Sequence, residues 1–273
     1  DNTLWGGVIG EDGIENIKVG HDGIGNSFKN FQRAIKKVQS SGILLAIISK
    51  NNEKDVRNVF KLHKEMILKE KDIINFKINW KDKSRNIIDI AKELNLSLDS
   101  FVVWDDNPLE RKKIRINCKG VEVIEPAEDV SDWSNQLLET ISLTKFNITK
   151  EDRDKTHQYH QRAKFISDKE LSTNELNYLK SIKIKPRVIE INKDNISRAQ
   201  QLCEKTNQFN TTLKRYSLSE IKKIKRKDFI KLINLKDLYG DHGIVGLIHF
   251  QNDKKNKNMR IHLFLLSCRI LGR

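Results

Sequence analysis

The sequence predicts an α/β fold whose first half is a doubly wound parallel sheet, with helices on both faces. Short apolar runs rich in Ile, Leu and Val alternate with amphipathic segments over residues 41–126. Such runs are typical of strands buried on both faces, and the alternation is typical of strand–helix–strand units. Two adjacent acids also stand at a strand end, where the ligands of doubly wound sheets bind.

The predicted elements of the first half follow in order along the chain. Strands are expected within residues 41–52, 73–80, 99–108 and 121–126. Helices are expected within residues 52–66, 82–96 and 111–118. In the first of these helices Val56, Val59 and Phe60 recur at helical spacing, which indicates one apolar face.

The second half shows a different pattern, which begins after a charged helical stretch. Strands are expected within residues 187–192, 228–240, 243–252 and 259–268, and helices within 196–210 and 217–224. Ser217 and Glu220 have the spacing of a capping box, and residues 241–243 predict a turn. We therefore predict a domain at residues 1–136, a helical connector at 137–181 and a second α/β domain at 182–273.

The composition is polar and strongly basic. Hydrophobic residues make up 37% of the chain and charged residues 32%, with a formal net charge of +14. The periodic apolar segments argue against a disordered chain. The charge alone permits nucleic-acid binding, but the Lys residues are dispersed and few aromatic residues lie among them. We expect no nucleic-acid partner, whereas an anionic substrate or an acidic protein would suit the charge.

The cysteines and the chain ends indicate the cellular setting. Cys118, Cys203 and Cys268 are widely spaced, without a zinc-site pair, and their odd number argues against a disulfide framework. No apolar run is long enough to span a membrane, and the first residues are no signal peptide. We expect a reduced, cytoplasmic protein with no membrane partner. Without an initiator Met, and with a last apolar strand that has no tail, the chain is expected to be cut at both ends.

Side chains suited to phosphoryl transfer occur in four stretches of the first half. They are Asp1, Thr3, Ser49, Lys83, Asp105 and Asp106. Phosphoryl transfer through an aspartyl phosphate needs two carboxylates, a hydroxyl and a Lys for the phosphoryl oxygens, and acids for Mg²⁺. A Ser at a strand end is also typical of a turn, and a Lys at a helix start is typical of a solvated surface. The two adjacent acids are more informative, because they repel unless a cation or a donor is present.

The chain resembles a known family through several longer motifs. "DNTLWGGVIGEDG" at residues 1–13 and "DDNPLER" at 105–111 resemble signatures of the haloacid dehalogenase (HAD) superfamily, subfamily IIIC, and more closely those of the FkbH-like proteins. "KTNQFNTTLKRY" at 205–216, "GDHGIVG" at 240–246 and the final "LSCRILGR" belong to the same resemblance. It implies a capless HAD-like doubly wound parallel sheet, followed by a GNAT-like α/β domain.

The resemblance implies roles for the phosphoryl-transfer side chains. Asp1 matches the second Asp of the first motif, the general acid/base, and Thr3 matches the motif Thr. The nucleophilic Asp would then lie two residues before Asp1, outside the chain. Ser49 would be the phosphate-binding hydroxyl. Lys83 would be the Lys of the third motif, with Lys81 as the alternative.

The same resemblance implies a Mg²⁺ site and a substrate flap. Asp106 would be a Mg²⁺ ligand, with Asp105 as its acidic neighbour and the Asp1 carbonyl facing the metal. Asn51 would bind substrate. The glycine-rich residues 5–13 predict a β-hairpin with tight turns, which could also cover the substrate phosphate.

In the second half, the resemblance implies a site for phosphopantetheine. Arg269, Gly272 and Arg273 match positions of the GNAT turn whose backbone N–H groups bind the cofactor phosphate. Cys268 is either a small buried residue or a thiol that carries an acyl group. The remaining polar candidates belong either to a helix cap and turn or to a substrate-binding site, and they are Asn207, Asn210 and Thr211. His242 is either a base or a solvent-exposed turn residue.

Together these features imply a coupled reaction. The resemblance implies that a glyceryl unit is taken from a phosphorylated three-carbon substrate, 1,3-bisphosphoglycerate, with Mg²⁺ and loss of phosphate. The unit would be placed on the phosphopantetheine thiol of an acyl carrier protein, in polyketide or surface-polysaccharide biosynthesis. Two alternatives stay open: a plain HAD phosphatase whose second domain only binds a partner, and a basic binding module without enzymatic activity.

Overall fold

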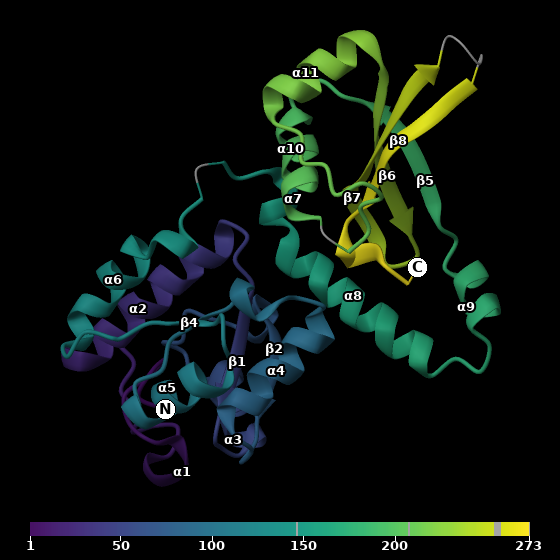
Figure 1. Ribbon diagram of the computed structural model, residues 1–273. Coiled ribbons are helices and arrows are strands. Elements are labelled where there is room, and N and C mark those ends of the chain that lie inside the picture. The colour runs from purple at the N-terminus through teal and green to yellow at the C-terminus, as the bar shows by residue number, and fades with distance from the viewer. Residues whose placement is uncertain (146, 207, 254–257, 273) are drawn as a thin grey trace. The chain divides into compact units, whose positions relative to one another are not determined.

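A computed structural model describes residues 1–145, 147–206, 208–253 and 258–272 (Figure 1). The chain is a mixed α/β protein that divides into two compact units, Asp1–Ile148 and Thr149–Arg273. Each unit has hydrophobic clusters of its own. Within the described residues, no helix combines the length and the apolar character that a membrane crossing requires.

Unit 1 contains the strand–helix alternation predicted for residues 41–126. Its strands are β1 (Leu45–Ser49), β2 (Ile73–Ile78), β3 (Val102–Val103) and β4 (Glu122–Val123). Its helices are α1 (Ile9–Asp12), α2 (Gly23–Ser40), α3 (Glu53–Leu62), α4 (Lys83–Leu94), α5 (Pro108–Asn117) and α6 (Trp133–Glu139). The side chains of Asn52 and Asn107 cap α3 and α5, which fixes each helix start directly after a strand-end loop.

The doubly wound parallel sheet predicted for this unit is found in part, as two parallel strand pairs. β1 pairs in parallel with β2, and β3 pairs in parallel with β4, but no described strand joins the two pairs. A continuous sheet would need a strand that hydrogen-bonds to β1 along one edge and to β3 along the other. Helices nevertheless cover both faces, because Ile47 packs in the cluster of α3 while Ile48 packs with α4 and α5.

The first 40 residues depart furthest from the prediction. The hairpin expected at residues 5–13 is instead the short helix α1, flanked by a single antiparallel bridge between Gly6 and Lys18. Helix α2 was not predicted, although Phe28, Phe31 and Val38 repeat at helical spacing. These side chains are buried against α6, and the Trp133 ring meets Phe28 and Phe31 edge-on.

Unit 2 is built on an antiparallel sheet in the order β5-β6-β7-β8. The strands are β5 (Lys185–Glu190), β6 (Phe229–Asp237), β7 (Gly240–Asp253) and β8 (Asn258–Leu266). The helices are α7 (Lys150–Arg153), α8 (Lys155–Glu170), α9 (Glu175–Ser181), α10 (Ile196–Lys205) and α11 (Leu218–Lys227). α10 and α11 pack on the sheet through a buried cluster that includes Leu202, Ile221 and Leu247. The predicted strands and helices of this half are found, while the GNAT-like assignment stays a prediction.

Two local predictions in unit 2 have clear outcomes. The capping box is present, since Ser217 and Glu220 each bond the other's backbone N–H at the start of α11. The turn predicted at residues 241–243 is wrong, because β7 already begins at Gly240. His242 is therefore inside the sheet, only 4% exposed, with Nε2 2.8 Å from Asp237 Oδ1. It is not a solvent-exposed turn residue.

Candidate active site

The predicted phosphoryl-transfer side chains of unit 1 come from distant segments and lie close together. Thr3 Oγ1 donates a hydrogen bond to Asp106 Oδ1 at 2.9 Å, and Lys83 Nζ donates to Asp105 Oδ2 at 2.5 Å. Asp1 lies two residues before Thr3, and its carboxylate accepts from Asn51 Nδ2, two residues after the end of β1.

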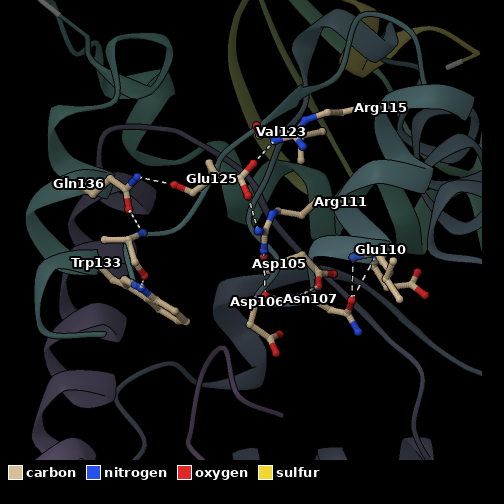
Figure 2. A network of polar contacts seen from close by, with 12 residues as sticks. Asp105, Asp106, Asn107, Glu110, Arg111, Arg115, Val123, Glu125, Trp133 and Gln136 are labelled. Atoms are coloured by element: carbon tan, nitrogen blue, oxygen red, sulfur yellow. Dashed lines mark hydrogen bonds and ion pairs between the residues drawn. The ribbon is translucent and has the colours of Figure 1, made fainter. Parts of the chain in front are cut away.

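Local sequence places the two acids at the tip of β3. Asp105 and Asp106 follow the strand within three residues, and Asn107 then caps α5 by accepting from the N–H groups of Leu109 and Glu110 (Figure 2). The Asn107 N–H donates to Asp105 Oδ1 at 3.0 Å. Asp105 is buried, whereas Asp106 is partly exposed. The turn therefore directs the first carboxylate inward to Lys83 and leaves the second nearer to solvent.

The Asp1 carboxylate is held by three neutral donors. Oδ1 accepts from Trp5 Nε1 at 3.1 Å and from the Ile9 N–H at 3.0 Å, and Oδ2 accepts from Asn51 Nδ2 at 2.7 Å. Asn51 is buried and its Oδ1 also accepts from the N–H of Asn52. The structure thus uses Asn51, predicted to bind substrate, to orient Asp1.

Ser49 and the two candidate lysines lie at the same edge of the strands. Ser49 ends β1, its carbonyl accepts from the Asn79 N–H at 3.0 Å, and Asn51 reaches Asp1 two residues further on. Lys81 is exposed, whereas Lys83 is the first residue of α4 and bonds Asp105. The geometry favours Lys83 over Lys81, and the phosphate-binding role of Ser49 stays a prediction.

Ion pairs connect the loops that surround these side chains. Lys50 Nζ lies 2.9 Å from Glu110 Oε1 and 4.0 Å from Asp82 Oδ1, and Lys113 Nζ lies 4.0 Å from the same Asp82 oxygen. Burial acts to raise the pKa of Glu110, but the hydrogen bond from Lys50 and the charges of Lys50, Lys113 and Lys83 together outweigh it, and the pKa is lowered. These contacts tie the loop after β1 to the starts of α4 and α5.

The donor set fits a Mg²⁺ ion held mainly by water and substrate oxygens. Among the described residues, no group of three or more His, Cys, Asp or Glu side chains could hold a metal by itself. The predicted ligand Asp105 is instead engaged by Lys83 and the Asn107 N–H. Mg²⁺ usually takes one or two carboxylates and completes its shell with water and phosphates. Asp106, which is partly exposed and bonded by a neutral hydroxyl, suits that role.

In unit 2, the residues of the predicted phosphopantetheine site bond to helix α8. Cys268, partly exposed, begins a short turn after β8, and Arg162 Nη1 donates to the carbonyls of Cys268 and Arg269 at 3.0 and 2.9 Å. Arg269 Nη1 donates to Gln158 Oε1, and burial lowers the pKa of Arg269. Gly272 has a positive φ of 90°, and its carbonyl accepts from Lys169. Arg273 lies outside the described residues.

The polar run after α10 bonds to its own backbone and to β8. Asn210 Oδ1 accepts from the N–H groups of Thr212 and Leu213 at 3.3 and 2.9 Å. Thr211 exchanges two hydrogen bonds with the Phe264 backbone. Asn207 lies outside the described residues. These contacts match the helix-end and turn alternative, while substrate binding by Asn210 and Thr211 stays a prediction.

Two residues that support the site were not predicted from the sequence. Trp5 Nε1 donates to Asp1 Oδ1, whereas its place in a glycine-rich segment predicts only a hairpin. Arg111 bonds the backbone of Asp105 and Asp106. The available signal for Arg111 was its place in "DDNPLER", six residues after Asp105, on the turn of helix that follows the strand end.

Comparison with known proteins gave one similar solved structure. No family model matches the chain, and no curated protein matches it. The structure is the crystal structure of the N-terminal part of the protein BF1531 from Bacteroides fragilis, described as containing a phosphatase domain and as complexed with Mg. The two are 46% identical, with a TM-score of 0.49, over 51% of this chain and 38% of that chain. The chain thus spans well under half of the BF1531 chain.

Proposed function

We propose that unit 1 is a Mg²⁺-dependent phosphatase domain that works through an aspartyl phosphate. The observation that carries the proposal is the convergence of three separate segments, which hold Asp1, Lys83 and the Asp105–Asp106 pair. The Thr3–Asp106, Asn51–Asp1 and Lys83–Asp105 hydrogen bonds join them, and Lys83 and the two acids lie beyond the carboxyl ends of the parallel strands β2 and β3. The 46% identity to a chain described as containing a phosphatase domain agrees with it.

In this proposal each side chain has a defined task. Lys83, oriented by Asp105, neutralises charge on the phosphoryl oxygens. Asp1, oriented by Trp5 and Asn51, moves the proton as general acid/base. Asp106 and the Asp1 carbonyl would hold Mg²⁺, which neutralises phosphate charge when bound. By resemblance, the attacking carboxylate lies two residues before Asp1 and is not part of residues 1–273.

The finer proposal is transfer of a glyceryl unit from 1,3-bisphosphoglycerate to the phosphopantetheine thiol of an acyl carrier protein. Its support is the family resemblance of residues 205–216 and 240–246, together with the partly exposed thiol of Cys268. The net charge of +14 suits an anionic substrate and an acidic carrier protein. Unit 2 would then bind the acyl group and the pantetheine arm.

Both levels of the proposal can be tested with the full-length gene product that carries this chain. It is incubated with Mg²⁺, 1,3-bisphosphoglycerate and a phosphopantetheinylated carrier protein. Phosphate release and the intact mass of the carrier are recorded. Asp1→Asn should abolish phosphate release, while the matched variant Glu15→Gln, at an exposed acid of the same segment, should not.

The outcomes separate the candidates. No Mg²⁺-dependent phosphate release would overturn the phosphatase proposal. Phosphate release with an unmodified carrier would leave the plain phosphatase and remove glyceryl transfer. A glyceryl mass gain that is lost in Cys268→Ser, with phosphate release retained, would support an acyl-carrying thiol. Nucleic-acid binding with a steep salt dependence and no metal requirement would favour the basic binding module.

A further inference from the structure

Arg111 of α5 holds the backbone of the two adjacent acids. Its Nη1 donates to the carbonyl oxygens of Asp105 and Asp106, both at 2.8 Å (Figure 2). Arg111 is only 7% exposed. A guanidinium that is buried to this extent is stable only where acceptors compensate for the lost hydration. Here the acceptors include the two peptide groups that carry the site carboxylates.

The carboxylate of Glu125 holds the second terminal nitrogen of the guanidinium. Arg111 Nη2 donates to Glu125 Oε1, and Arg115 Nη2 donates to Glu125 Oε2 at 2.5 Å. Hydrogen bonds from Arg115 and Arg111 lower the pKa of Glu125, so its carboxylate is charged at neutral pH. The Glu125 carbonyl also accepts from Gln136 Nε2 of α6 at 2.6 Å. Figure 2 shows this chain of contacts running from the β3 tip to α6.

We infer that Arg111 is a positioning residue of the site. By holding two successive carbonyls, it fixes the peptide planes that set the directions of the Asp105 and Asp106 side chains. The first carboxylate then meets Lys83, and the second meets Thr3 and would bind Mg²⁺. The inference rests on the proposed function for its metal part, but the backbone arrangement can be tested without metal.

The fork shape of the guanidinium is what this role requires. One Nη contacts both carbonyls while the other contacts Glu125, and a Lys ammonium is a single point charge that cannot span these positions. Arg111→Lys therefore keeps a positive charge but cannot bond both carbonyls and Glu125 at once. Arg115→Lys is the matched control, because Arg115 shares Glu125 and the same helix but contacts Val123 O rather than the two acids.

The experiment uses three measurements on the full-length gene product and both variants. Mg²⁺ affinity is measured by calorimetry without phosphate substrate, kcat and KM are measured for phosphate release, and amide hydrogen exchange is measured without metal. Exchange of the Asn107 N–H reports on the Asp105 side chain, which accepts its hydrogen bond. We expect Arg111→Lys to weaken Mg²⁺ binding at least 10-fold, to lower kcat more than it raises KM, and to speed Asn107 exchange at least 10-fold. Arg115→Lys should stay within 3-fold of wild type in all three.

Each outcome decides one of the two proposals. If wild type neither binds Mg²⁺ nor releases phosphate, the proposed function is wrong, and the Asn107 exchange alone decides whether Arg111 positions the acids. Unchanged Asn107 exchange in Arg111→Lys overturns the inference whatever the activity. Equal losses in Arg115→Lys also overturn it, since they would indicate a general effect on α5. If Arg111→Lys does not fold, Glu125→Gln should give the same pattern in weaker form, and wild-type behaviour of Glu125→Gln overturns the inference.

Discussion

Lys83 and Asp105 show how single residues set the properties of the site. Their side chains are 16% and 7% exposed, so both charges have lost most of their hydration. Coulomb attraction and the additional hydrogen bond from the Asn107 N–H offset that loss. Each charge is then stable only while its partner is present.

Lys83→Met should therefore destabilise unit 1 by about 3 kcal/mol, because it leaves a buried carboxylate without its cation. The double variant Lys83→Met/Asp105→Asn should recover most of that stability, since neither charge remains, but it should not recover activity. Urea unfolding monitored by tryptophan fluorescence measures both effects. A single variant within 0.5 kcal/mol of wild type, a bound taken roughly from ordinary surface substitutions, would contradict this account.

His63, the residue after α3, gives a pH prediction. Its Nδ1 is buried and finds no hydrogen-bond partner among the described residues. Burial lowers its pKa below the ordinary value of 6.5, with Glu65 acting to raise it and Lys69 to lower it. Below pH 6.5 the unfolded chain takes up the proton more readily than the folded one, so stability should fall as the pH falls through that value.

The titration of His63 can be isolated by comparing wild type with His63→Leu at pH 7.5 and pH 5. Wild type should lose more unfolding free energy between these values, by up to about 1.4 kcal/mol for each unit by which the folded pKa is lowered. Unfolding by urea at each pH gives the difference. Equal losses in the two proteins would show that His63 does not contribute.

At the scale of elements, helix caps fix where the chain turns from strand or loop into helix. In α11, Ser217 Oγ accepts from the Glu220 N–H at 3.3 Å, and Glu220 Oε2 accepts from the Ser217 N–H at 2.8 Å. These bonds satisfy donors that the first helical turn leaves unpaired. Asn107 does the same for α5 and thereby also fixes the end of the β3 turn.

Ser217→Ala should destabilise unit 2 by about 1 kcal/mol, because the cap oxygen is lost while the surroundings are largely exposed. Ser217→Asp keeps an acceptor at the same place and should stay close to wild type. Thermal or urea unfolding compares the three proteins. If Ser217→Asp is as unstable as Ser217→Ala, the effect does not come from the cap.

At the scale of the whole molecule, the two units have separate hydrophobic clusters. The clusters of unit 2 contain only residues from Ile184 onward, and those of unit 1 end at Leu143. Leu247 of β7 is completely buried in the main cluster of unit 2. A change there acts on contacts that belong to that unit.

Leu247→Ala should destabilise unit 2 by about 2–5 kcal/mol through the cavity that it leaves. We expect faster amide exchange across β6, β7 and β8 and unchanged exchange in β1 and β2. The reciprocal variant Val59→Ala, at a fully buried position of α3, should affect only unit 1. Parallel changes in both units would show that they do not unfold separately.

The sequence by itself determined the order of elements from residue 41 to 126, the four strands of unit 2 and the capping box of α11. These features depend on apolar periodicity and on hydrogen bonds between near neighbours, both of which are visible in a local stretch of chain. The sequence analysis overestimated the lengths of β3 and β4, because an apolar run does not show how many of its residues pair with a neighbouring strand. It also missed α2, whose apolar face is buried by packing against α6.

Only the tertiary structure decided how the site side chains are paired. Lys83 bonds Asp105 rather than Asp106, and Asn51 donates a hydrogen bond to Asp1. Arg111 donates to the backbone carbonyl oxygens of both Asp105 and Asp106. Continuity of the sheet was decided at this level too, since β1 and β3 pair with different partners. The physical reason is that each of these contacts depends on where separate segments meet and which direction each side chain then takes. The spacing of residues along one segment determines neither the meeting point of two segments nor the direction of a side chain there.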